Sequence, residues 1–277
     1  MARLLRLWRL YATMDLLYLA RGPDVALTYY VSELIIGGSA ITATFLLAER
    51  FDGLGPWTKQ AVFFMLAYAL IVRGLLNTFF NYNLSHISRR VGRGQLDHVL
   101  IQPQPLWSAF VTEGFAPVTG SSMLVPGVAL LVWSLGHFDS PPTPTWWVFF
   151  AMNLLASSAI VMAFEYAWGS IAFWAPRAAE EVNSHTWDLL MQLAPFPLEG
   201  MPALALGALV TLIPVGLVAW WPSRTLLGLD SPSLPLDLAL PVAAIVFCAV
   251  ASWIFQRGLR QYGRTGSSRY LDYGHRR

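Results

Sequence analysis

Six long apolar runs separated by short polar segments make up most of the chain. A helix needs about 20 apolar residues to cross a hydrocarbon core about 30 Å thick, and runs of this length meet that requirement. The runs are apolar on every face and lack the two-residue alternation of a membrane β-barrel. We therefore predict an all-α integral membrane protein whose single transmembrane domain covers residues 1–277. The predicted spans are about 27–48, 61–83, 108–135, 146–174, 202–221 and 238–257.

The N-terminal segment has a different pattern, because its charges alternate with leucines. Arg3, Arg6 and Arg9 recur every three residues and so share one face of a helix. A cleavable signal peptide would instead place an unbroken apolar core after its charges. We expect a basic amphipathic helix at about 3–20 that lies in the membrane interface and ends before Pro23, with a plain cytoplasmic tail as the alternative.

Composition supports the membrane class. Only 12% of the residues are charged, 56% are hydrophobic and the mean hydropathy is +0.51, whereas a soluble domain carries about 25% charged residues. The single cysteine, Cys248, lies inside an apolar run. A disulfide within the chain and a cysteine-based metal cluster are therefore both excluded.

The distribution of arginine and lysine predicts the orientation. If the N-terminus is cytoplasmic, segments on that side hold fourteen of the eighteen basic residues, counting Arg257 at the end of the last span, and the opposite segments hold three. Both termini are therefore expected in the cytoplasm, with 175–201 as a cytoplasmic loop. The fifth run is the least regular, because it contains Pro202, Pro214 and Pro222. The stretch 223–237 is too short to cross, and we expect a surface loop or short helices that dip back into the outer leaflet.

Several catalytic motifs are missing. Lys59 is the only lysine, so the Gly-Lys-Ser or Gly-Lys-Thr of a phosphate-binding loop is absent. The chain also lacks G-x-S-x-G, H-E-x-x-H and C-x-x-C, and its five histidines are scattered over loops and ends. We predict no catalytic residues, no bound cofactor or metal and no nucleic-acid partner. If the protein does ATP-driven work, the ATPase is another polypeptide.

Four ionisable residues fall in the interior of predicted spans, away from their last residues: Glu33, Arg73, Glu113 and Glu165. A charge at the bilayer centre costs about 2.5–3.5 kcal/mol on insertion scales, so such residues usually face the protein interior or an aqueous cavity. They are candidates for a substrate pathway or for inter-helix pairs, or else they snorkel from span ends. An ion-coupled secondary carrier would use them. A membrane-embedded enzyme would need paired acids or histidines near one face, which the pattern does not show.

Residues 88–107 read SRRVGRGQLDHVLIQPQPLW and interrupt the apolar pattern on the predicted cytoplasmic side. Three arginines form a basic collar after the second span, and two glycines then free the backbone to turn. Leu96, Val99 and Leu100 follow with the spacing of one apolar stripe on a two-turn helix, which ends before Pro103. A helix this short is marginal in water. We therefore expect its stripe to dock on the membrane surface or in a groove of a partner.

This loop resembles the cytoplasmic loop of ABC-2 type exporter permeases, most closely a bacterial subgroup formerly described as a domain of unknown function. That subgroup typically shows Gly-(Glu/Gln)-Leu-Asp-x-x-Leu-(Leu/Ile)-x-Pro here. The matching positions are Gly94, Gln95, Leu96, Asp97, Leu100, Ile101 and Pro103. The chain departs at Gln95, where glutamate is common, and at Gln102, where arginine is common, which alters the charge offered to a partner. The resemblance continues at Phe173-Trp174, Ile213-Pro214, Trp221-Pro222 and 258–262, and so covers nearly the whole chain.

The resemblance implies six helices per subunit, an N-terminal interfacial helix, and a dimer of permeases formed with the same or a different chain. It implies two ABC ATPase subunits that bind ATP and Mg²⁺ and drive export by alternating access, in a bacterial cytoplasmic (inner) membrane. It also implies that a coupling helix in this loop is seated in a cleft of the ATPase. The expected contact residues are Arg93, Gly94, Gln95, Leu96, Asp97, His98, Val99, Leu100 and Ile101. The transported substrate stays open.

Overall fold

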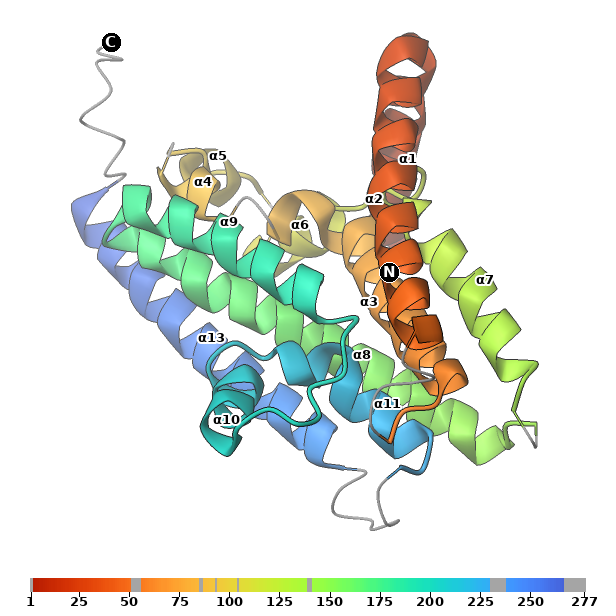
Figure 1. Ribbon diagram of the computed structural model, residues 1–277. Helices are drawn as coiled ribbons and strands as arrows, with labels where there is room; N and C mark the ends of the chain where they lie inside the picture. Colours follow the sequence, from red (N-terminus) through yellow and green to blue (C-terminus); the bar gives the residue numbers. More distant parts are fainter. Residues whose placement is uncertain are drawn as a thin grey trace.

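The computed structural model of the chain describes residues 2–50, 56–84, 87–92, 94–103, 105–138, 141–229 and 238–266. The elements in these ranges are helices, which confirms the all-α prediction there (Figure 1). The long helices are α1 (Ala2–Arg21), α2 (Pro23–Arg50), α3 (Lys59–Leu84), α8 (Pro144–Gly169), α9 (Pro176–Leu193) and α13 (Ala239–Thr265). The shorter elements are α4 (Ile87–Gly92), α5 (Leu96–Leu100), α6 (Leu106–Thr112), η1 (Gly120–Ser122), α7 (Leu124–Leu135), η2 (Ser170–Phe173), α10 (Ala203–Thr211), η3 (Gly216–Trp220) and α11 (Trp221–Leu226).

Helices α3, α8 and α13 run in the same direction through the bundle. Phe64 of α3 packs on Phe150 of α8, and further along both helices the Tyr68 hydroxyl lies 3.2 Å from the Ser157 hydroxyl. The contacts between α8 and α13 likewise advance together along both helices. All three helices therefore begin at one end of the bundle, which we call the far end. They finish at the other, near residues 87–103, which we call the loop end.

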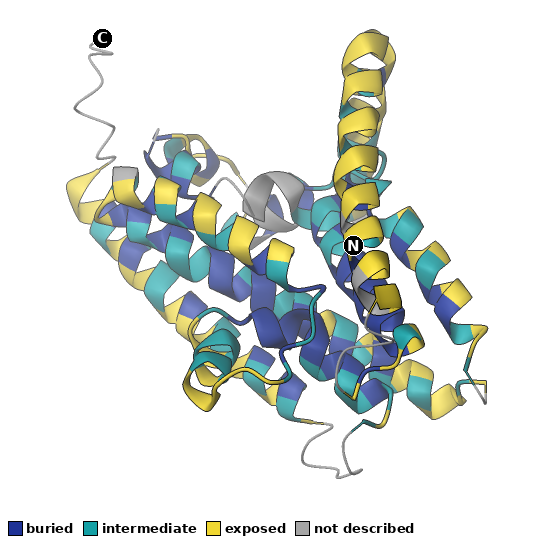
Figure 2. Ribbon diagram, viewed as in Figure 1, coloured by how far each residue is buried: buried dark blue, intermediate teal, exposed yellow. Residues whose placement is uncertain are grey.

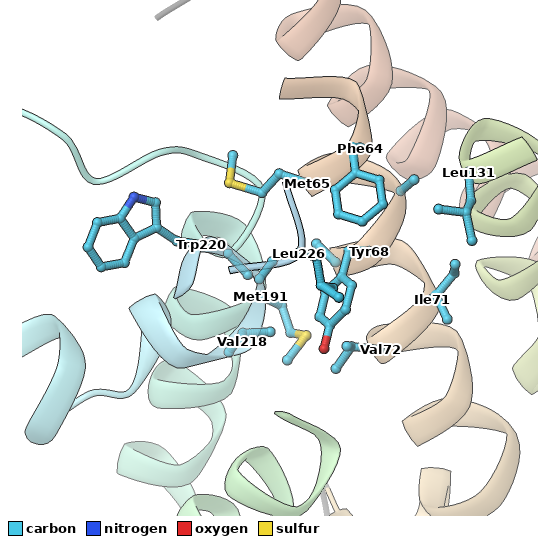
Figure 3. Close-up of a cluster of buried hydrophobic side chains, with 14 of the residues drawn as sticks. Phe64, Met65, Tyr68, Ile71, Val72, Leu131, Met191, Val218, Trp220 and Leu226 are labelled. Carbon is cyan, nitrogen blue, oxygen red and sulfur yellow. The ribbon is translucent and has the colours of Figure 1, made fainter. Parts of the chain in front are cut away.

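The core forms around α3, which is apolar on every side. Phe64, Met65 and Tyr68 are fully buried and belong to a cluster with side chains of α7, α9, η3 and α11 (Figure 3). A helix that is hydrophobic all round is expected to be buried. In the most apolar stretch of α3, 78% of the residues are buried. The share is only 6% for α2 and 17% for α13, and α2 is largely exposed in Figure 2. The exposed apolar faces of α2 and α13 are expected to contact lipid or other membrane helices.

The third predicted span, 108–135, is not one helix, because α6, η1 and α7 replace it with turns between them. A Cβ atom on Gly120 would lie 2.5 Å from the Asn77 carbonyl oxygen, and one on Gly74 would lie 2.5 Å from the Leu124 nitrogen. These glycines let the backbone of η1 and α7 lie directly against α3. The prediction of a continuous helix is therefore wrong here, since the chain turns to follow the surface of α3.

The fifth predicted span, 202–221, is bent, because α10 and the η3–α11 pair meet at 78°. The Ser157 hydroxyl, in the middle of α8, donates to the Leu217 carbonyl oxygen at 3.1 Å. Near the far end, the Trp146 indole N–H donates to the Leu226 carbonyl oxygen at 2.9 Å. Hence η3 and α11 lead from the middle of the bundle to its far end, and the irregularity expected of this segment takes the form of a sharp bend.

Residues 175–201, expected as a cytoplasmic loop, contain the helix α9 instead of a loop. Near its start at the loop end, Glu180 accepts a hydrogen bond from Arg89 at 2.7 Å. After it ends, Glu199 accepts one at 3.0 Å from Arg224 of α11, in the far half of the bundle. The 18 residues of α9 rise about 27 Å, so the helix carries the chain between the two halves. It follows that the bent pair of α10 and α11 lies after the chain has reached the far half.

By length and composition, four helices of the described residues can cross a membrane, or five if the bent pair counts as one, against six predicted. The four are α2, α3, α8 with η2, and α13. The bent pair lies at 203–226, and most of the stretch 223–237, expected as a surface loop or as short dipping helices, lies outside the described residues at 230–237. The N-terminal helix expected over about 3–20 is α1, whose placement at a membrane interface stays a prediction.

The path of α9 makes a testable prediction about sidedness. In a Cys248→Ser background, a cysteine at exposed Met201 should react with a membrane-impermeant maleimide from the side opposite to one at exposed Gln102. The physical reason is that Glu199 and Arg224 are in contact, which places residue 201 in the far half. Labelling of both cysteines from the same side would contradict the path described for α9.

Candidate functional site

Residues 87–103 lie at the loop end, where α4 and α5 are beside α9 and the last turns of α13 (Figure 1). Gly94 joins α4 to α5 with a φ of 70°, a left-handed conformation that favours glycine. The Gln95 N–H donates to the Arg90 carbonyl oxygen at 2.8 Å and closes the turn. This turn sets the direction of α5. Arg93, which belongs to the expected contact set, lies outside the described residues.

The apolar stripe of α5 is mostly buried inside the chain. Leu96 and Val99 are 0% and 6% exposed and pack against Phe173 of η2 and Tyr262 of α13. The other buried members of this cluster are Val91, Ala109, Ala172 and Ala179. The expectation that the whole stripe docks on a membrane or a partner is therefore wrong for Leu96 and Val99. Their burial supplies the tertiary contacts that a helix this short needs.

A hydrogen bond also fixes α5 to α13. The Tyr262 hydroxyl donates to Asp97 Oδ1 at 2.6 Å, and Tyr262 is only 5% exposed. A Cβ atom on Gly258 would lie 2.1 Å from Phe173 Cδ2, so the end of α13 lies directly against η2. Thus α5 is joined to α13 and, through η2, to the end of α8. The sequence interpretation missed Tyr262 and Phe173 as partners of α5, although both lie in stretches that carry the family resemblance.

The other side of α5 is exposed and ends in two large apolar side chains. Leu100 is 44% and Ile101 is 79% exposed, and Gln95 and His98 are exposed on the same element. We call these four residues the exposed tip. No lysine, arginine or carboxylate is among them. Adjacent exposed apolar side chains flanked by polar ones are typical of a protein contact surface.

Two arginines of the predicted basic collar are paired with acids. Arg89 Nε donates to Glu180 Oε1 of α9 at 2.7 Å, and Arg90 Nη2 donates to Glu113 Oε2, just after α6, at 2.8 Å. The side chains of Arg90 and Glu113 are 6% and 13% exposed, so this pair is largely withdrawn from water. The placement of Glu113 inside a continuous span is therefore wrong. Its carboxylate neutralises a buried guanidinium at the loop end.

Helix α1 is attached to the same region. Burial raises the pKa of the Tyr11 hydroxyl, the Glu113 carboxylate raises this pKa further, and the Arg90 guanidinium lowers it. The Asp15 carboxylate accepts hydrogen bonds from the Val118 N–H at 2.8 Å and from the Thr119 hydroxyl at 2.8 Å. Because its pKa is raised, the Tyr11 hydroxyl stays neutral near pH 7. The hydrogen bonds of Asp15 hold α1 against the turn between α6 and η1.

The other ionisable residues of the predicted spans are dispersed. Glu33 of α2 accepts a hydrogen bond from the Ser122 hydroxyl at 3.1 Å. Glu165 of α8 is fully buried on the side of α9, and neither of its carboxylate oxygens has a hydrogen-bond partner among the described residues. Arg73 of α3 has a buried Nε that also lacks one there. No ion pair within the described ranges joins any two members of the predicted set, so the structure does not form a relay from them.

The described ranges contain no group of three or more His, Cys, Asp or Glu side chains placed to hold a metal ion. Cys248 is a free thiol on α13. The exposed tip, with the contacts that fix α5 in place, is therefore the candidate functional site that the geometry singles out.

Comparison with known proteins identifies the family. A family model described as "ABC-2 family transporter protein" matches residues 34–266, which is well over half of the chain. The comparisons with curated proteins and with solved structures gave no match. The matched region includes all of α3 to α13, and therefore the whole candidate site.

The two sides of α5 should respond differently to the same substitution. Truncation of a buried leucine lowers the free energy of unfolding by about 2–5 kcal/mol. Leu96→Asp should lower it by at least that much, because this variant also buries a carboxylate. Ile101→Asp should change it by less than about 0.5 kcal/mol, since this side chain is exposed. Thermal unfolding in detergent measures both. Equal destabilisation by the two variants would contradict the placement of the stripe.

Proposed function

Because the chain belongs to the ABC-2 family of transporter proteins, we propose that it is the permease subunit of an ABC exporter. It is a multi-pass membrane protein with no phosphate-binding loop, since Lys59 is its only lysine. ATP and Mg²⁺ are therefore bound and hydrolysed on separate ABC ATPase subunits, and this chain is not itself the enzyme. The family implies association with such an ATPase in one complex.

The observation that carries the proposal is an exposed apolar tip on a rigid base. Leu100 and Ile101 project from a helix whose other side is buried. In the proposed complex the exposed tip, rather than Leu96 and Val99, is seated in the ATPase cleft. Gln95, a member of the exposed tip, carries no charge, so the contact depends mainly on the apolar burial of Leu100 and Ile101.

The same geometry supports a route for the mechanical signal. Movement of α5 displaces Tyr262 and Phe173, because both side chains pack in the apolar cluster with Leu96 and the Tyr262 hydroxyl also donates to Asp97. The route therefore leads to α13 and α8, which lie side by side (Figure 1). In the proposed cycle, closure of the ATPase dimer moves α5 with the ends of both helices, and the helices alternate access to the substrate.

The proposed arrangement in the membrane follows from this assignment. The loop end faces the cytoplasm of a bacterial cell and contacts the ATPase, so both termini are cytoplasmic. With α6–α7 as the third crossing and α9 as the fifth, the chain crosses the membrane six times. Two permease subunits, identical or different, complete the pore with two ATPase subunits. The alternative of an ion-coupled carrier gains no support, because Glu33, Arg73, Glu113 and Glu165 do not lie together.

The exposed tip should determine ATPase binding. Ile101→Asp should reduce co-purification of the partner ATPase from native membranes by about tenfold or more, because it places a charge in an apolar contact. The measurement is quantitative mass spectrometry of the purified complex. Gly263→Asp is the matched control, since it adds the same charge at another exposed position near the loop end. An unchanged ATPase yield with Ile101→Asp, at normal expression, would contradict the proposed contact.

Helices α5 and α13 should move as one body during the ATPase cycle. We place spin labels on cysteines at 102 and 263 in a Cys248→Ser background. The distance distribution between the two labels should be the same without nucleotide and with nucleotide trapped on the ATPase. The reason is that the Tyr262–Asp97 hydrogen bond and the surrounding apolar cluster fix the two elements together. Tyr262→Phe should broaden that distribution while the ATPase remains bound. A shift on nucleotide trapping in otherwise intact protein would rule out the proposed route.

A further inference from the structure

A groove of about 590 Å³ lies between α2 and the η1–α7 segment. Its walls include Val31, Leu34 and Ile41 from α2, and Met123 and Val125 from the facing segment. Apolar side chains and glycines form most of the lining, and of its twelve residues only Glu33 is charged. The groove therefore combines a large apolar surface with a single negative group, which is how many small-molecule sites are built.

Glu33 lies deep in the predicted membrane span. Within the apolar stretch Pro23–Leu46 of α2 it is the eleventh of 24 residues, which places it near the middle of that stretch. A charged side chain at this depth is costly unless it is paired. Ser122 supplies one hydrogen bond at 3.1 Å. No cation forms an ion pair with Glu33 within the described ranges, so a counter-charge from outside the chain fits there.

Two neighbouring glycines shape the groove. A Cβ atom on Gly37 would lie 3.2 Å from the Met123 side chain, so this glycine allows α2 to approach the facing wall. A Cβ atom on Gly38 would meet nothing within 4 Å, because this position faces the open groove. Only 6% of the apolar window of α2 is buried, so a molecule dissolved in the membrane has access from the side.

We propose that this groove binds hydrophobic cations, with the positive group against Glu33 and the apolar body along α2 and α7. The occupant is a cation that dissolves in the bilayer core, such as an ammonium or phosphonium ion with bulky apolar substituents. A resident lipid does not fit, because its headgroup stays at the interface while Glu33 lies near mid-membrane. As an assignment of substrate class, the proposal rests on the permease function proposed above.

The test is equilibrium binding to the purified protein in nanodiscs of zwitterionic lipid. The probe is radiolabelled tetraphenylphosphonium, which enters the bilayer core as a cation. Saturable binding is expected, with competition by dodecyltrimethylammonium and little by dodecyl sulfate or dodecyl maltoside. Glu33→Gln should raise the Kd about tenfold or more, as expected for loss of one charged contact in a low-dielectric site. Gly38→Phe should abolish binding while the carboxylate remains, because the ring fills the groove.

Two matched variants should bind the probe normally. Glu49→Gln removes another carboxylate from α2, one that pairs with Lys59 and lies outside the groove. Gly207→Phe adds the same ring at a different open position, on α10. Unchanged affinity in Glu33→Gln, or equal competition by the anionic and neutral detergents, would overturn the proposal. Because the assay needs neither ATPase nor transport, its failure is distinct from loss of ATPase co-purification, which tests the permease function.

Discussion

The attachment of α5 to the end of α13 is the interaction on which the loop end depends. A helix of five residues has no stability of its own in water, yet Leu96 and Val99 are buried and Asp97 accepts a hydrogen bond from Tyr262 at 2.6 Å. Once this side is buried against the chain, only the exposed tip is left for a partner. The same contacts that fix the helix therefore define which residues are presented and which helices would follow their movement.

The charges around this attachment have a related role. Arg90 and Glu113 are largely buried and joined at 2.8 Å, and breaking such a pair by removing one partner typically costs about 3–5 kcal/mol. Arg89 and Glu180 add a second link, from α4 to α9. Together they tie α4, α6 and α9 into one unit at the loop end, while α2 stays loosely packed at its side. A loop end joined in this way, beside a lightly packed α2, suits a protein in which displacement of the loop end moves the membrane helices.

The sequence predicted the all-α class, the approximate positions of α2, α3, α8 and α13, and the unusual character of residues 88–107. Long apolar runs give these features directly, since length and hydropathy are local properties. It failed where packing decides. Gly74 and Gly120 bring η1 and α7 onto α3, which breaks the third run, and α9 was hidden because its charged residues resemble those of a loop. The stripe of α5 was recognised, but periodicity alone does not tell whether the chain itself or a partner covers it.

The most direct test of the central claim is site-specific crosslinking in native membranes, with a single cysteine at position 101 or at position 99 in a Cys248→Ser background. A short bifunctional maleimide should link the cysteine at 101 to a polypeptide that contains a phosphate-binding loop, identified by mass spectrometry. The cysteine at 99 should give no such product, because this position is 6% exposed and faces the chain's own apolar cluster. An ATPase crosslink from 99 and none from 101 would contradict the proposal that the exposed tip is the docking surface.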